Sequence, residues 1–112
     1  MKTILLALAV TAGLAAQQPQ PESPELREAK HHFDLAAIRA AANFRSSDSI
    51  DARLRNDGAV LHPRLTMLRM RIEAALSEAR YEMDRHDYPA AEEALTRADA
   101  LLDRFAREIG GY

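Results

Sequence analysis

The chain of 112 residues has no cysteine, no tryptophan, and only four glycines and five prolines. Without cysteine it has no disulfide framework, zinc–thiolate site, thiol nucleophile or lipoprotein anchor. So little glycine and proline argues against a collagen-like or linker-like chain. A strong charge of one sign is also missing, because 15 basic residues face 17 acidic ones. This balance argues against a dedicated nucleic-acid binder, which is typically basic.

The composition is that of a small folded protein. Hydrophobic residues make up 47% of the chain and charged residues 29%, which is unlike a disordered tail. The length allows one small domain. No stretch alternates apolar and polar residues in the way a half-buried strand does, so no sheet is predicted. The sequence therefore predicts an all-α domain.

Residues 1–16 (MKTILLALAVTAGLAA) have the layout of a secretory signal peptide. Lys2 is followed by an unbroken apolar run and then by small residues up to Ala16. We expect cleavage after Ala15 or after Ala16. The apolar segment is shorter than the roughly 18 to 20 residues that a membrane span needs, so no stable span is expected once it is removed. The sequence predicts export to a bacterial periplasm or to the exterior.

The remaining chain divides into a short leader and a helical domain. Residues 17–22 (QQPQPE) contain no apolar side chain to bury, and we expect a flexible Gln/Pro leader there. The helical domain spans residues 23–112. Its first helix begins with Ser23 as the N-cap and Pro24 in the first helical position. Apolar residues then recur at spacings of three and four as far as about Phe44, which predicts an amphipathic helix.

The apolar stripe of this first helix is rich in alanine, so the helix buries little area per residue. Leu35 and Ile38 widen the stripe. The pattern changes at residues 46–49 (SSDS), which are typical of turns and helix caps. We expect the connector 45–61 to be either a short helix capped by Ser49 or an irregular loop.

A second helix is predicted after His62, with Pro63 in its first turn and its end near Arg85. Its apolar face is broad, which favours a central position in contact with two neighbours. Met67 and Met70 flank the main apolar stripe. We expect these methionines to fill gaps in the core, which is the common role of methionine in a helix.

A third helix is predicted after a short turn. Asp87 is a suitable cap, Pro89 fits the first turn, and Gly110 and Gly111 end the helix. Because the turn is short, the second and third helices should be antiparallel neighbours, with the first helix packed across them. The predicted fold is a three-helix bundle with an antiparallel C-terminal αα-hairpin.

Four residues at the start of the third helix have a spacing found in a known repeat family. They are Tyr88, Ala91, Leu95 and Ala98. Over about residues 75–98 this spacing resembles a single tetratricopeptide repeat, with His86 where the family usually has a turn glycine. The resemblance implies a peptide- or protein-binding adaptor without catalytic residues, and it makes the four residues candidates for an interaction site. An ordinary αα-hairpin has the same local pattern.

A second resemblance lies at residues 65–69 (LTMLR). This segment resembles the LTxxQ motif of small periplasmic helical chaperones, with Arg69 in place of the glutamine. It implies a small exported chaperone or stress-response protein.

The histidines and carboxylates are not spaced for metal binding or catalysis. His31 and His32 point about 100° apart on a helix, so they share no face. The four histidines include no HExxH pair. We expect exposed histidines, His62 near a helix start, and acidic residues in solvated pairs with arginine. The sequence thus predicts no metal site, no cofactor and no enzymatic activity.

Arginines gather near the start of the second helix. Arg64, Arg69 and Arg71 follow closely after Arg53 and Arg55. They form either a solvated face or a basic patch with weak affinity for an anionic surface or an acidic partner. Aromatic residues do not alternate with them, so nucleic acid is not an expected partner.

These observations together predict an exported, non-enzymatic protein-interaction module that binds a protein partner or a second copy of itself. A small periplasmic helical chaperone is the alternative.

Overall fold

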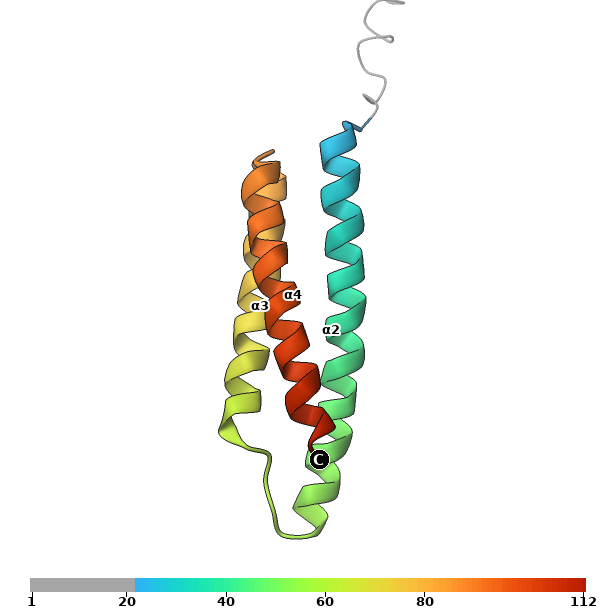
Figure 1. The fold of residues 1–112 in the computed structure, drawn as a ribbon, viewed down its shortest axis with the longest axis vertical. Coiled ribbons are helices and arrows are strands. Elements are labelled where there is room, and N and C mark those ends of the chain that lie inside the picture. The colour runs from blue at the N-terminus through green and yellow to red at the C-terminus, as the bar shows by residue number, and fades with distance from the viewer. Residues whose placement is uncertain (1–21) are drawn as a thin grey trace, which may run out of the picture.

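The computed structural model describes residues 22–112, and within this range the chain forms three helices and no strand (Figure 1). The helices are α2 (Pro24–Asn56), α3 (Pro63–Asp84) and α4 (Tyr88–Gly110). The predicted all-α, three-helix fold is confirmed. The expected signal peptide, and the leader up to residue 21, lie outside the described residues.

A side-chain cap begins each helix, as predicted for Ser23 and Asp87. The side chains of Ser23, His62 and Asp87 each accept a hydrogen bond from a backbone N–H in the first turn. A proline stands in the first or second position of each helix. The predicted ends of the second and third helices are also correct to within a residue, because α3 ends at Asp84 and α4 at Gly110.

The predicted helix break at residues 46–49 is wrong, because α2 continues to Asn56. Ser47 is 4% exposed and lies seven residues, or two turns, after the buried Ala40. A small side chain on the buried face thus extends the packing surface of the helix. Serine favours turns and the ends of helices, but the packing of Ser47 on the buried face outweighs that preference here. The chain leaves α2 at Gly58, whose φ of 77° is left-handed.

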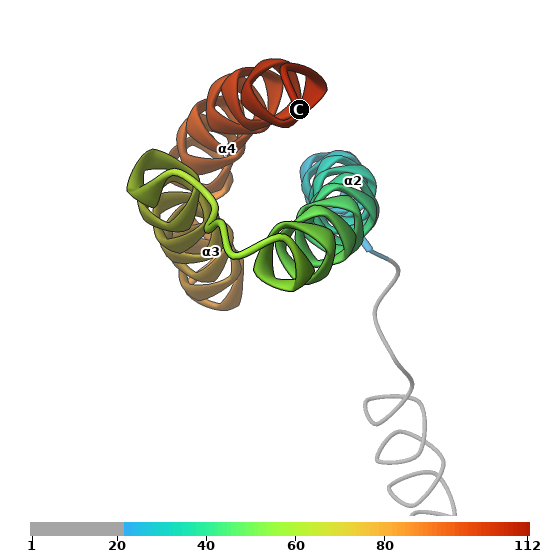
Figure 2. The ribbon, with the colours of Figure 1, turned by 90° about the horizontal axis from the view of Figure 1, so that it is seen from below.

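At 33 residues, α2 is about 50 Å long and extends beyond the other helices at its C-terminal end (Figure 1). The two helices α3 and α4 form an antiparallel hairpin, and α2 lies against it (Figure 2). The hairpin helices pack more extensively on each other than either packs on α2. Of the two, α4 makes the larger contact with α2, so α4 takes the central position that we expected for the second helix.

The core is built mainly from the hairpin. The largest fully buried side chains are Phe105, Leu65, Ile72, Leu95 and Leu102. On α2 the buried apolar residues are the small Ala29, Ala36 and Ala40. The larger Phe33 and Phe44 of α2 are partly buried against this core, and polar contacts add to the attachment of the helix.

The expected core positions of Met67, Met70, Leu35 and Ile38 are wrong, because all four side chains are more than half exposed. Successive residues of a helix are rotated by about 100°. Met70 is two residues from the buried Ile72, so its side chain points to the opposite side of α3. Ile38 has the same relation to a buried alanine of α2. The apolar face of each helix is thus narrower than the sequence pattern indicated.

Candidate interaction surface

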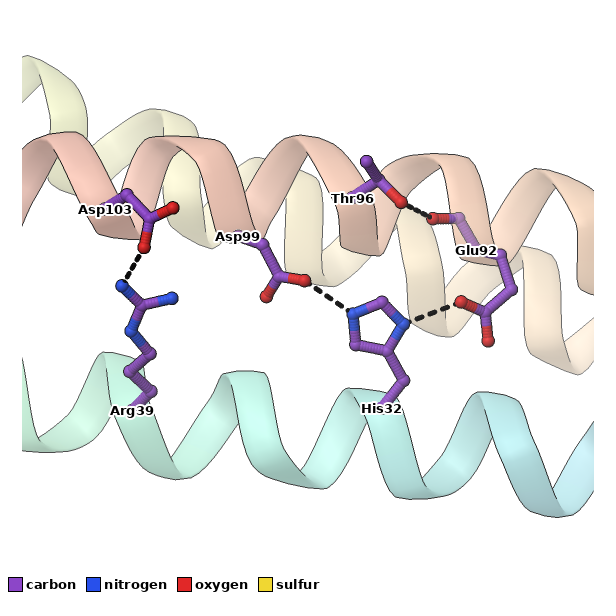
Figure 3. Close-up of polar contacts among 6 residues, drawn as sticks. All are labelled: His32, Arg39, Glu92, Thr96, Asp99 and Asp103. Carbon is purple, nitrogen blue, oxygen red and sulfur yellow. Dashed lines mark hydrogen bonds and ion pairs between the residues drawn. The ribbon is translucent and has the colours of Figure 1, made fainter.

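A histidine on α2 contacts two carboxylates of α4. The Nδ1 atom of His32 lies 2.6 Å from Oε2 of Glu92, and its Nε2 atom lies 2.7 Å from Oδ2 of Asp99 (Figure 3). The two acidic residues are seven apart on α4, so they stand two turns apart on one side of the helix. The imidazole fits between them and links the two helices.

This arrangement favours the charged form of the histidine. Burial by itself lowers the pKa of His32, but the hydrogen bonds to Asp99 and Glu92 outweigh it and raise the pKa above its ordinary value. A neutral imidazole has only one N–H to donate, whereas the imidazolium donates to both carboxylates. The His32 side chain is 26% exposed, so the expectation that the histidines are solvated is wrong for this one.

A second ion pair continues the contact along the two helices. Arg39, seven residues after His32, pairs with Asp103, four residues after Asp99 (Figure 3). Its hydrogen bond lowers the pKa of Asp103 below the ordinary value. We call His32, Arg39 and their three acidic partners on α4 the polar seam. Its side chains are paired with one another, and the described part of the chain has no three His, Asp or Glu side chains placed to share a metal ion.

The residues that carry the tetratricopeptide resemblance lie mostly inside the hairpin. Ala91, Leu95 and Ala98 are fully buried. Tyr88 is half-buried, and its hydroxyl lies 3.0 Å from Nδ1 of His86 in the turn. The three buried residues hold the hairpin together and present no surface to a partner in this structure.

Arg69 is turned toward α2. Its Nη1 donates to Asp48 at 2.8 Å, and its Nε lies 3.5 Å from Glu73. Its guanidinium carbon stands 4.4 Å from the centre of the Phe44 ring, which in turn packs edge-on against Phe105 at 5.5 Å. Arg69 therefore ties α3 to α2 and is not available as part of a basic patch.

The other two predicted arginines join a different set. Arg64 and Arg71 line a cavity of about 190 Å³ together with Arg104 of α4, and Met67 and Leu68 complete the lining. Arg104 is distant in sequence, and only the antiparallel pairing of α3 with α4 brings it beside Arg71. The basic cluster thus belongs to the hairpin and not to the start of one helix.

An exposed apolar line runs along the outer face of α3, opposite the core. Met67 is 54% exposed, Met70 is 64% exposed and Tyr81 is 59% exposed. Their spacings of 3 and 11 residues place them on one side of the helix, with the exposed Ala74 between them. We call Met67, Met70 and Tyr81 the outer α3 line. Met67 also lines the cavity formed with the three arginines, so the outer α3 line and this cavity are continuous.

Comparisons with family models, with curated proteins and with solved structures found no match for this chain. Among the helices within residues 22–112, none combines the length and apolar character needed to cross a membrane. The exposed surface of the hairpin combines the outer α3 line with a group of arginines beside it.

Proposed function

We propose that this chain is an exported, non-enzymatic protein-interaction module that binds its partner through the outer α3 line. The observation that carries the proposal is the exposure of three large apolar side chains on one side of one helix. Large exposed apolar patches are typical of interaction sites, and Met67 and Met70 stand one turn apart on this face. Two of the three are methionines, whose flexible side chains adapt to a partner's surface.

Two sequence features support the same proposal. The layout of residues 1–16 supports export. The resemblance of residues 75–98 to a tetratricopeptide repeat supports an adaptor role, with the buried residues shaping the hairpin and the outer face making the contact. A non-enzymatic role agrees with the polar seam, where the acidic and basic side chains are paired with one another.

Site-specific photo-cross-linking in the native cells tests this proposal. A photoreactive phenylalanine analogue at Met70 should yield one dominant adduct of defined mass. The same analogue at Arg53, an exposed position on α2, should yield none. Replacing Met67 with serine should weaken the adduct at Met70 because it removes apolar area from the contact. No adduct at Met70, or equal adducts at both positions, would contradict the proposal.

The alternative is a small helical chaperone that holds partly unfolded clients. Its supporting observation is that two further apolar residues, Leu35 and Ile38 on α2, are exposed in addition to the outer α3 line. Exposed apolar side chains on two helices suit a protein with many clients. The chaperone function predicts a broad set of adducts from Met70 and suppression of aggregation of a chemically unfolded test protein. A single adduct with no effect on aggregation would favour the interaction module.

A further inference from the structure

Charged side chains of α3 and α4 meet along one edge of the hairpin. Near one end, Nη1 of Arg64 donates to Oε1 of Glu108 at 3.1 Å. Nearer the other end, Arg97 of α4 pairs with Glu78 of α3. Each of these pairs joins a base with an acid, so each is satisfied within the protein.

The middle of the same edge holds two bases and no acid. Arg71 lies seven residues from both Arg64 and Glu78, and Arg104 lies seven residues from Arg97, so both occupy this edge of the hairpin. They line the 190 Å³ cavity, whose other lining residues are Arg64, Met67 and Leu68. Neither Arg71 nor Arg104 makes an ion pair with any residue from 22 to 112.

The guanidinium groups of Arg71 and Arg104 repel each other across this cavity and together attract an anion. A guanidinium group donates two parallel hydrogen bonds, which match the oxygens of a carboxylate. Met67 gives the same cavity an apolar wall, and this wall continues into the exposed Met70. The cavity thus combines recognition of a negative group with recognition of an apolar side chain next to it.

We infer that this cavity receives a carboxylate from an acidic, amphipathic segment of a partner protein. An apolar side chain of the same segment packs on Met67 and Met70. This inference rests on the proposed function, because it names the chemistry of the partner that the outer α3 line would contact.

The overall charge favours a protein segment over an anionic membrane as the occupant. The chain carries a formal net charge of −2, so an extended negative surface is repelled by much of the molecule. One acidic side chain that enters the cavity meets arginines and apolar atoms. Binding to an anionic membrane surface would therefore overturn the inference.

Fluorescence anisotropy with a synthetic peptide tests the inference on the purified chain. The probe is a labelled helical peptide with leucine and glutamate at alternating turns of one face, and the control probe has glutamine at every glutamate position. The glutamate peptide should bind more tightly than its glutamine counterpart. Arg71→Gln and Arg104→Gln should each weaken its binding about tenfold, because each removes a charged hydrogen-bond donor.

A matched variant separates the cavity from general charge effects. Arg53→Gln removes the same single charge from an exposed position on α2 and should leave peptide binding unchanged. Circular dichroism should show the same helix content in all variants. Equal binding of both peptides, or equal weakening in the α2 variant, would overturn the inference. Binding to phosphatidylglycerol vesicles without binding to the peptide would also overturn it.

Failure of this inference and failure of the proposed function give different results in the two experiments. A defined adduct at Met70 with no affinity for the glutamate peptide would reject the acidic segment and keep the interaction module. Cavity-dependent peptide binding with no adduct at Met70 would show that the cavity binds an acidic segment but would reject the outer α3 line as the contact with a partner in cells.

Discussion

The Nε2 atom of His32 on α2 lies 2.7 Å from Oδ2 of Asp99 on α4, and this contact joins the longest helix to the hairpin. The other ring nitrogen contacts Glu92. The fully buried apolar residues of α2 are alanines, with Phe33 and Phe44 partly buried against the core, so the charge of one imidazole adds to the attachment of α2. The protonation of His32 therefore links pH to the attachment of α2.

We predict that the protein loses stability as the pH rises above neutrality. Below about pH 6.5, the ordinary pKa of histidine, His32 is charged in both the folded and the unfolded chain, and its contribution is complete. At higher pH the unfolded chain loses this proton first, because the pKa of His32 is raised in the folded state. The free energy of unfolding from urea titrations should fall by at most about 1 kcal/mol between about pH 6 and pH 9, since solvent screens exposed pairs.

Two histidine variants provide the control for this pH effect. His32→Gln should remove most of the decrease, whereas His31→Gln, at the exposed neighbouring position, should keep it. Asp103, whose pKa is lowered, stays ionised throughout this pH range and contributes no slope. An unchanged pH dependence in His32→Gln would show that the seam does not carry the effect.

A second prediction separates two arginines that are close in sequence. Arg69→Met should lower the free energy of unfolding by about 1 kcal/mol, because Arg69 pairs with Asp48 and stacks on Phe44. Arg71→Met should change it by less than about 0.5 kcal/mol, as is usual for an exposed side chain. Urea unfolding followed by circular dichroism measures both. Similar losses in the two variants would contradict the assignment of Arg69 to the α2–α3 contact.

Features set by neighbouring residues could be predicted from the sequence. The caps at Ser23 and Asp87 depend on one side chain and the next turn of backbone. The antiparallel hairpin follows from the short turn after α3 and the helical spacing on both sides. The buried positions Ala91, Leu95 and Ala98 also follow from that spacing.

Features set by contacts between distant residues could not be predicted. Ser47 remains helical because it packs on the buried face of α2, which outweighs the local tendency of serine to form turns. Met70 is exposed because the buried face of α3 is narrow, and sequence pattern alone does not fix that width. Arg104 lies 33 residues from Arg71 in sequence, and only the register of the hairpin places both on one cavity.

A third prediction concerns the close packing of the hairpin. Ala98 is fully buried on α4, and Ala98→Leu should lower the free energy of unfolding by about 1 to 3 kcal/mol, because the added atoms have no space. Ala100→Leu makes the same change at an exposed position of α4 and should have an effect below about 0.5 kcal/mol. Thermal unfolding of the two variants compares them directly. Equal stability of the two would mean that the hairpin has room at position 98.

The last prediction concerns the turn between α3 and α4, where His86 has a φ of 61°. This left-handed conformation brings the Cβ atom of any residue other than glycine close to backbone and costs about 1 kcal/mol. His86→Gly removes that cost but also the contact between Nδ1 and the hydroxyl of Tyr88, which is exposed and contributes little. The glycine variant should therefore be more stable than the natural chain by up to about 1 kcal/mol. His86→Ala loses the same contact and keeps a Cβ atom, so it should gain nothing. If urea titrations show that both variants gain equally, relief of backbone strain at position 86 is not the cause.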